Sequence, residues 1–328
     1  MPVIREYNSI YHLKGTWTRL YEKSDTKSCF LQAFTPNKVY FNAFKFDRHR
    51  FLLQPRFIYA SDDESEIIFP ITVDKTHKRI TEFAPLDYFD IISYRATPEL
   101  VSAILSWLKL RYPRYDFIFS RISQDSILLR MKELFPTELA ECVSISFKFD
   151  SFDEYIASLS KHQRQNIRTA YNRLEREHIR IAIKRYDNDR FFPSGLKRAC
   201  SDIYYRRSAD KSPTSSVFRQ FYNRISKPVL QIMKKADNGV FYVLFLNDEP
   251  AAFMAGGFTK DNDCYTVPVF SSSNKHLRYS PGIVMICELA ELFISERVSI
   301  LDLAKGSEPY KYAMGGRSHY NYSVSLKG

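Results

Sequence analysis

The stretch Gly239–Phe270 reads GVFYVLFLNDEPAAFMAGGFTKDNDCYTVPVF and decides how the chain is expected to fold. Its apolar and β-branched residues form three runs of strand length, at 240–246, 251–258 and 264–270. The segments between the runs, NDEP and TKDND, are rich in residues that favour turns. Because short turns join antiparallel neighbours, the stretch predicts a three-stranded antiparallel meander.

The residues that follow the meander predict a further α/β succession. After the loop SSSNKHLRYSPG (271–282), apolar residues at helical spacing predict a helix from Gly282 to about Glu296. Strands are predicted at Val298–Leu303 and in the last alternating run, YNYSVSL (320–326). Between them stands DLAKGSEPYKYAMGG (302–316), which places three of the chain's ten glycines around a charged pair. The order is β-β-β-loop-α-β-loop-β.

A basic segment precedes the meander. Residues 161–185 contain eight Lys or Arg and two Glu, a local excess of 8 − 2 = 6 out of a net charge of +11. A helix is predicted from about Phe152 to Glu177, with Ser151 as N-cap and Glu154 completing a capping box. Lys161, Arg164 and Arg168 share one face of it. That face is either solvated surface or a site at which the arginines bind phosphate.

The first half, residues 1–148, alternates short β-rich runs with helical patterns such as TPELVSAILSWLKLRY from Thr97, a predicted N-cap. It is expected to be a mixed α/β domain, with residues 149–328 as a second domain and the boundary near Phe149. A chain of 328 residues fits two domains. The segment Lys78–Tyr94 is expected to help shape an acceptor site.

The amino-acid composition indicates which kind of partner and which cellular compartment to expect. The five cysteines are odd in number and lack metal-ligand spacing, which favours a reducing compartment. No secretory signal and no apolar run long enough to span a bilayer is seen, so a soluble, cytoplasmic protein is expected. The histidines show no metal-ligand spacing, and no metal site is predicted. The positive charge indicates an anionic partner.

Three stretches together carry a resemblance: LSKHQRQNIRTAYNRLE (159–175), RYSPGIVM (278–285) and LDLAKGSEPYKYAMGG (301–316). With the order of elements, they resemble the acyltransferases of the GNAT superfamily, in the CelD-like group associated with bacterial cellulose and exopolysaccharide synthesis. That group is similar to the FemABX peptidoglycan aminoacyltransferases, which have two GNAT-like halves in tandem. The resemblance is specific over about 150–316 and only architectural over 1–148. It implies an α+β fold of two tandem GNAT-like domains, each a mixed, mostly antiparallel sheet flanked by helices.

The resemblance also implies a donor site. Acetyl-CoA or another acyl-CoA would lie in a V-shaped opening between the third and fourth core strands, its pantetheine pairing with backbone near Val267 and Val269. Its pyrophosphate would sit on the loop from Arg278 to Ile283, which includes Ser280 and Gly282. The unpaired N–H groups of the helix that starts here suit a phosphate. RYSPGI has fewer glycines than the usual GNAT phosphate loop.

Candidate catalytic residues follow from what acyl transfer needs: a proton acceptor, stabilisation of the oxyanion and protonation of the leaving group. Glu308 would accept a proton or orient the acceptor, and Lys311, which loosely matches a FemABX lysine, would offset negative charge. Tyr310 or Tyr312 would protonate the leaving group. The structural alternative for Glu308 and Lys311 is an i,i+3 surface ion pair. Asp302, at the end of a predicted strand, is a further candidate, and its structural alternative is to cap the strand or pair with Lys305.

The leading hypothesis is an acyltransferase that moves an acyl group, in the first instance acetyl, from acyl-CoA to an amine or hydroxyl of a sugar or cell-envelope precursor. A second hypothesis is a FemABX-like transferase that uses aminoacyl-tRNA, which the basic segment 161–185 would suit. A third is a non-catalytic GNAT-fold protein that binds nucleic acid or an anionic surface through the same segment.

Overall fold

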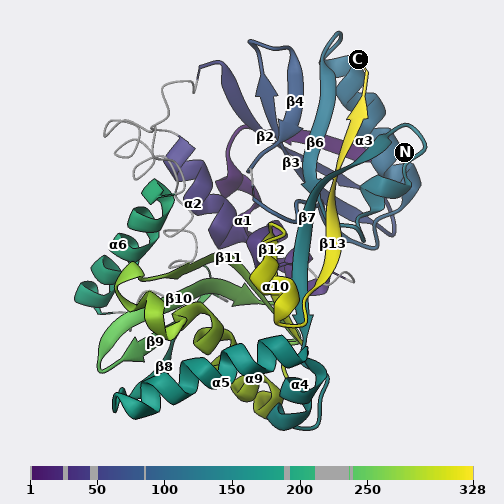
Figure 1. Cartoon of the computed structure of the whole chain (residues 1–328). Coiled ribbons are helices and arrows are strands. Elements are labelled where there is room, and N and C mark those ends of the chain that lie inside the picture. The colour runs from purple at the N-terminus through teal and green to yellow at the C-terminus, as the bar shows by residue number, and fades with distance from the viewer. Residues whose placement is uncertain are drawn as a thin grey trace. The chain divides into compact units, whose positions relative to one another are not determined.

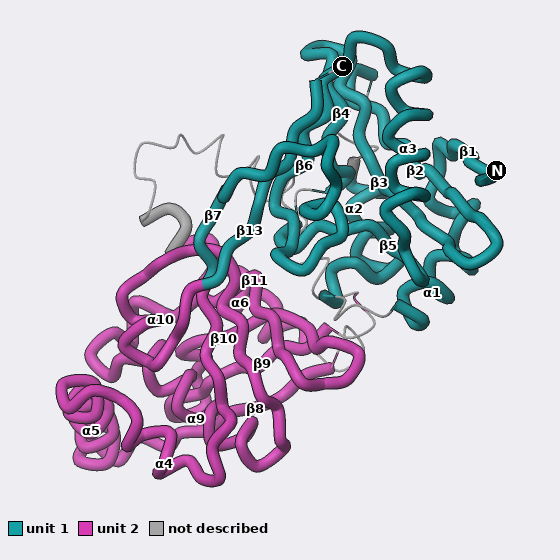
Figure 2. The backbone as a smooth tube through the Cα atoms, turned by 90° about the vertical axis from the view of Figure 1, so that its right-hand side faces the viewer, with its two compact units in different colours: residues 1–142, 319–328 teal, residues 143–318 magenta. Residues whose placement is uncertain are grey.

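The chain divides into two compact units in a computed structural model that describes residues 2–24, 29–44, 51–84, 86–187, 193–210, 236 and 239–327. Unit 1 comprises residues 1–142 and 319–328, and unit 2 comprises residues 143–318 (Figure 2). The sequence placed a single boundary near Phe149. The structure instead returns the chain's last ten residues to unit 1, because the final strand pairs there.

Unit 1 is a mixed sheet with helices, built from β1 (Val3–Tyr7), α1 (Lys14–Lys23), α2 (Phe34–Phe44), β2 (Leu53–Ser61), β3 (Glu66–Asp74), β4 (Arg79–Glu82), β5 (Ile92–Tyr94), α3 (Pro98–Arg111), β6 (Asp116–Ile122) and β7 (Phe135–Ser146). The strand order is β1-β2-β3-β4-β6-β13, where β13 (Arg317–Leu326) is the last strand of the chain and β5 pairs with β3. Of these neighbours, only β4 and β6 pair in parallel. The Thr97 side chain accepts the Leu100 N–H, which confirms the predicted N-cap of α3.

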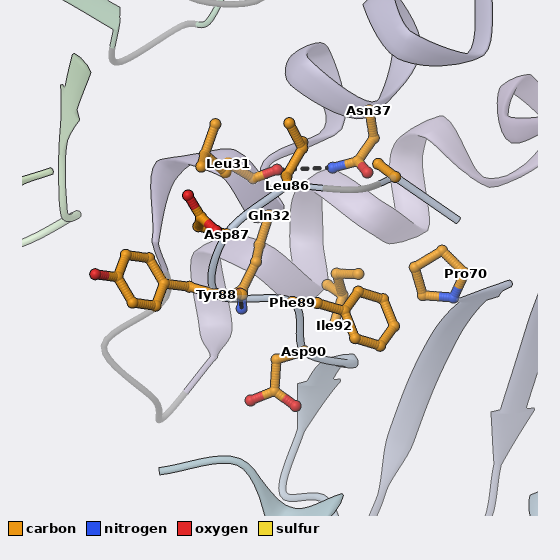
Figure 3. Close-up of a pocket in the computed structure, with 11 residues that line it drawn as sticks. Leu31, Gln32, Asn37, Pro70, Leu86, Asp87, Tyr88, Phe89, Asp90 and Ile92 are labelled. Atoms are coloured by element: carbon orange, nitrogen blue, oxygen red, sulfur yellow. Dashed lines mark hydrogen bonds between the residues drawn. The ribbon is translucent and has the colours of Figure 1, made fainter. Parts of the chain in front are cut away.

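A pocket of about 280 Å³, counting space open to solvent, lies in unit 1 beside the segment 86–92 (Figure 3). Two polar side chains that line the pocket donate hydrogen bonds to backbone carbonyl groups. Asn37 donates to the carbonyl of Leu31 at 2.9 Å, and Gln32 donates to the carbonyl of Tyr88 at 2.9 Å. In Figure 3 the Tyr88 hydroxyl and the Asp90 carboxyl point away from Asn37. These amides therefore hold the chain around the pocket.

Unit 2 contains the predicted succession. Its elements are α4 (Phe152–Ser158), α5 (Lys161–Arg176), β8 (Ile181–Asp187), α6 (Ser194–Asp210), β9 (Gly239–Leu246), β10 (Glu249–Phe258), β11 (Cys264–Ser272), α9 (Pro281–Glu296), β12 (Ile300–Lys305) and α10 (Pro309–Ala313) (Figure 1). Strands β9, β10 and β11 pair antiparallel, as the opening stretch predicted. Strand β12 pairs parallel to β11, as expected for a strand that follows a crossover helix.

The predicted helix 152–177 is two helices in the structure. Ser151 caps α4 by accepting the Glu154 N–H, and the Glu154 carboxylate accepts the Asp150 N–H, close to the predicted capping box. Leu159 then adopts extended backbone, and Ser160 caps α5 by accepting the Gln163 N–H. The prediction of one continuous helix is wrong, because Ser160 caps a second helix, α5. The sequence also predicts a helical stretch from about Gly195 to Ala236. Its first part is α6, and residues 211–235 lie outside the described residues.

The two faces of the unit 2 sheet have different neighbours. Tyr242, Met254 and Tyr265 pack in one core with residues of α4, α5 and α9. The intervening side chains, such as Phe253 of β10, point to the opposite face, because side chains alternate along a strand. Helix α6 contacts β10 and β11. Figure 1 shows α4, α5 and α9 gathered together and α6 apart from them.

Candidate active site

The ladder between β11 and β12 is short, and the two strands then separate. Cys264, Tyr265 and Thr266 pair with Ile300, Leu301 and Asp302, while β11 continues to Ser272 and β12 to Lys305. The register of β10 against β11 shifts at Gly256, where a Cβ would lie 2.0 Å from the Thr266 carbonyl oxygen. Pro268, two residues on, has no N–H to extend a ladder. The structure thus has the predicted divergence, with Val267 and Val269 buried on β11 just beyond it.

The segment 273–280 connects β11 to the N-terminus of α9. Ser280 has a left-handed backbone (φ 51°), and its side chain makes no cap hydrogen bond. Its carbonyl accepts the N–H groups of Ile283 and Val284 at 2.9 and 3.1 Å. Pro281 occupies the first turn, where its missing N–H is tolerated. A Cβ on Gly282 would meet the Phe270 ring at 3.5 Å, an ordinary contact, so this junction and the end of β11 are neighbours.

Arg278 is held by a carboxylate. Its guanidinium contacts the Glu177 carboxylate and the Tyr279 hydroxyl, and Tyr279 donates to Glu177 at 2.6 Å. The Tyr279 hydrogen bond and the charge of Arg278 lower the pKa of Glu177. The sequence expected Arg278 beside a phosphate, whereas the structure places it in an ion pair at the surface. A phosphate would have to compete with Glu177 for it.

The stretch 302–316 curls around Lys311. Gly306 and Gly315 have positive φ values of 116° and 83°, which L-residues rarely adopt. Lys311 is 3% exposed, and its Nζ donates to the carbonyl oxygens of Leu303, Ala304, Lys305 and Gly306 at 3.0, 3.4, 3.2 and 2.9 Å. Glu308 Oε2 lies 3.1 Å from the same Nζ. The glycines therefore let the backbone wrap a buried ammonium group, and the expected Glu308–Lys311 pair exists but is not a surface pair.

The short helix α10 brings Tyr310 to the end of β11. Its ring meets the ring of Phe270 edge to face, with centroids 6.0 Å apart. Helix α10 is fixed by the next residues, because Met314 accepts the buried Tyr155 hydroxyl through its carbonyl at 2.9 Å. Gln163 also donates to the Met314 sulfur at 3.0 Å. The sequence pattern predicted a loop where α10 lies. Phe270 was not among the predicted site residues, although an aromatic residue at the end of the third predicted strand could have indicated it.

The two arginines proposed for phosphate have different surroundings. Arg164 donates to the carbonyl oxygens of Ala157 and Leu159 at 3.0 and 2.6 Å, so it closes the end of α4. Arg168 is exposed on α5. The two candidates are therefore not equivalent, and only Arg168 presents its side chain mainly to solvent.

The structure thus brings part of the predicted site together. Phe270 links Gly282 on one side to Tyr310 on the other. Among the described residues, no group of three or more His, Cys, Asp or Glu side chains is placed to hold a metal ion. In the same residues, no helix is long and apolar enough to cross a membrane.

Comparisons with known proteins agree with this geometry. Residues 161–312 match the family model described as an acetyltransferase (GNAT) domain. FemX is 11% identical, with 99% of this chain and 97% of that chain covered and a TM-score of 0.61. The C-terminal domain of a putative lysylphosphatidylglycerol synthetase from Agrobacterium fabrum is 10% identical, with 98% and 93% covered and a TM-score of 0.60. No curated protein matches the chain.

A tandem GNAT protein from the clavulanic acid biosynthesis pathway is also similar, at 9% identity, with 100% of this chain and 98% of that chain covered and a TM-score of 0.50. At such identities these likenesses establish the fold alone. They confirm the predicted α+β architecture of mixed sheets flanked by helices. Residues 161–312 therefore match the model of a GNAT acetyltransferase domain, and the chain has a fold similar to that of tandem-GNAT proteins.

Proposed function

We propose that the protein is an acyltransferase that moves an acyl group, in the first instance acetyl, from acyl-CoA to an amine or hydroxyl of a sugar or cell-envelope precursor. The observation that carries the proposal is the separation of β11 from β12 after the Thr266–Asp302 pair, inside the segment that matches the GNAT model. The backbone edge of β11 beyond this pair suits the amides of a pantetheine arm. The CelD-like group remains our assignment for its subfamily.

The remaining parts of the donor site follow from the elements at the end of β11. The α9 N-terminus offers partial positive charge to the pyrophosphate, with Gly282 allowing close approach to the backbone. Lys311 acts by fixing the 303–308 backbone around its ammonium group. In this proposal Tyr310, whose ring contacts Phe270, gives a proton to the leaving thiolate. Unit 1, with the pocket beside 86–92, is the acceptor-side half in this proposal.

Acetyl-CoA binding tests the donor site directly. Acetyl-CoA at 100 times its Kd should raise the free energy of unfolding by about 2.7 kcal/mol, and the melting temperature with it. Gly282→Ala should weaken this stabilisation, because its methyl group occupies the path to the backbone while the fold tolerates it. Gly15→Ala is the matched control, since nothing lies within 4 Å of its Cβ position and it is far along the chain from this site. Equal shifts in all three proteins would contradict the placement of the donor.

The aminoacyl-tRNA donor is the second candidate, favoured by the local excess of positive charge on 161–185. Binding to tRNA would be dominated by phosphate contacts and would weaken steeply with salt. Retention of tRNA that falls steeply between 50 and 200 mM salt, with no shift from any acyl-CoA, would replace the leading proposal. If tRNA then carried no acyl group to an acceptor, a non-catalytic binding protein would be the correct reading.

A further inference from the structure

One end of the unit 1 sheet brings several turns into a row. Strand β2 begins and β3 ends there, because Leu53 pairs with Asp74, and β4 begins there with Arg79 opposite Asp74. Strand β6 begins beside β4, with which it pairs in parallel. Strand β13 ends there, because Leu326 pairs with Phe117 (Figure 1). With neighbouring strands about 4.8 Å apart, the row from β2 to β13 is about 19 Å long.

The turns of this row carry an excess of positive charge. The Asp116 N–H donates to the Lys78 carbonyl at 3.0 Å, which brings the turn before β6 beside the turn between β3 and β4. Asp74 and Asp116 are the acidic residues of these turns, and the Asp74 carboxylate contacts the His77 ring at 2.7 Å. Exposed basic residues outnumber them: Lys75, Lys78, Arg79, Arg114 and Lys327.

Two large apolar side chains lie exposed in the same row. Phe51 is 71% exposed and Leu52 is 45% exposed, in the turn immediately before β2. The Leu52 carbonyl accepts the Lys75 N–H at 2.9 Å, so the apolar pair is next to the first of the basic residues. Single exposed apolar residues are common, but an adjacent pair beside a row of positive charge indicates an interaction surface.

We propose that this row, from Phe51 to Lys327, is a docking surface for a membrane that contains anionic phospholipids. Phe51 and Leu52 leave water by entering the boundary between headgroups and acyl chains, and the lysines and arginines contact the lipid phosphates. The long basic side chains suit this arrangement, because their apolar stems lie along an apolar layer while their charged ends stay in water. Nucleic acid bases stack on aromatic rings such as Phe51, but they provide no apolar layer for Leu52.

The two parts of this surface predict different responses to salt and to lipid composition. Each lysine or arginine close to an anionic membrane strengthens binding about fivefold, and salt weakens this attraction. Burial of Phe51 and Leu52 is not screened by salt, because it removes apolar surface from water. Binding should therefore require anionic lipid and fall as salt rises, and it should also depend on the two apolar side chains.

Sedimentation of the full chain with vesicles tests the apolar part. The wild-type protein should bind vesicles of equal parts phosphatidylcholine and phosphatidylglycerol, and it should not bind vesicles of phosphatidylcholine alone. Phe51→Ser/Leu52→Ser should weaken binding about tenfold or more, with an unchanged melting temperature because both side chains are exposed. Val3→Ser is the control, since Val3 is 47% exposed but pairs with Ser61 at the opposite end of β2.

A second pair of variants tests the charges. Lys75→Gln/Lys78→Gln should weaken vesicle binding about 25-fold, from two contributions of about fivefold each. Lys161→Gln/Arg168→Gln removes the same net charge from exposed positions of α5 in unit 2 and should bind vesicles as the wild-type protein does. A larger loss in the α5 variant than in the unit 1 variant would move the membrane contact to α5 and overturn the proposal.

The remaining outcomes also decide the matter. Absence of wild-type binding to the anionic vesicles overturns the proposal, and so does wild-type binding by Phe51→Ser/Leu52→Ser. Retention of RNA that is lost in Lys75→Gln/Lys78→Gln, without vesicle binding by the wild-type protein, would assign the row to nucleic acid instead. No acyl donor takes part in these measurements, so their failure would leave the proposed acyltransferase function standing.

Discussion

Lys311 places its ammonium group inside unit 2, where four backbone carbonyls and one carboxylate surround it. An ammonium group has three protons to donate, so these carbonyls already compete for all of them. The charge therefore serves first to hold the backbone from Leu303 to Glu308. We assign Lys311 as a positioning residue, which acts on the reaction through the shape of this segment.

Lys311→Met tests this assignment through stability. The methionine fills a similar volume but leaves the buried carbonyls without their donor, and a buried polar group left without its partner costs about 1–3 kcal/mol. Urea denaturation should show a loss of this size in the free energy of unfolding. Lys305→Met, at an exposed neighbour, should change it by less than 0.5 kcal/mol. A loss below 1 kcal/mol for Lys311→Met would show that the cage contributes little.

Asp90 in unit 1 gives a pH-dependent prediction. Burial raises the pKa of its carboxyl from 3.8 to about 6, although the Ser126 hydroxyl and the Ile91 N–H both bond to Oδ1. The folded state thus binds a proton more tightly than the unfolded state. This contribution to stability is fully present below about pH 4 and is lost as the pH rises through about 6.

Asp90→Asn keeps the oxygen acceptor and removes the titration. Relative to the wild-type protein, its free energy of unfolding should therefore rise by about 2–3 kcal/mol between pH 4 and pH 7, since each pKa unit corresponds to about 1.4 kcal/mol. Urea denaturation of both proteins at several pH values measures the difference. Asp63→Asn, the same change at an exposed site, is the control. A constant difference between wild type and Asp90→Asn across this range would refute the prediction.

At the scale of elements, the basic face of α5 carries two arginines with different surroundings: Arg164 bonds to carbonyl oxygens at the end of α4, and Arg168 is exposed. Arg164→Met removes the donors that close α4 and should lower the free energy of unfolding by about 1 kcal/mol. Arg168→Met should leave stability within about 0.5 kcal/mol. In a tRNA retention assay the order should reverse if the second candidate function holds, because Arg168 is the exposed charge. Equal stability losses in both variants would contradict the distinction.

The elements that the sequence predicted well are those fixed by local patterns. The β9–β11 meander follows from apolar runs separated by turn residues, and α9 follows from helical spacing behind Pro281. Helix α10 was missed because five residues give too little periodicity to detect. The break between α4 and α5 was missed because Ser160 reads as an ordinary polar residue until its capping hydrogen bond is known.

For the candidate site, the sequence indicated several elements but not the contacts between them. The helical spacing indicated a helix start at Gly282, the composition pointed to the glycines around Lys311, and the resemblance implied an opening between two strands. The sequence did not show that Arg278 pairs with Glu177, because the two residues are 101 positions apart. Its structural alternative for Glu308 and Lys311 was a surface ion pair, since i,i+3 spacing carries no information about burial. Long-range partners and burial are set by tertiary packing, which local patterns do not encode.

At the scale of the whole molecule, each unit has a hydrophobic core of its own. Among the described residues, the buried members of the core shared by α4, α5 and α9 lie between 145 and 314. The core of unit 1 that surrounds α3 includes Val324 and Leu326, which lie about 180 residues after the rest of that unit. Strand β13 pairs with β6 there, from Tyr322 to Leu326. Unit 1 therefore needs residues 319–326 to complete its core and sheet.

Removal of residues 319–328 should therefore unfold unit 1 in preference to unit 2. The truncation takes two core side chains and the strand that covers the edge of β6, while the unit 2 core keeps all its members. Hydrogen exchange should show lost amide protection in β2, β3 and β6 and retained protection in β9, β10 and α9. A chain that ends at Leu326 is the control and should match the full-length protein. Uniform loss of protection in both units would show that they fold as one cooperative body, and full protection in β6 would show that β13 is dispensable.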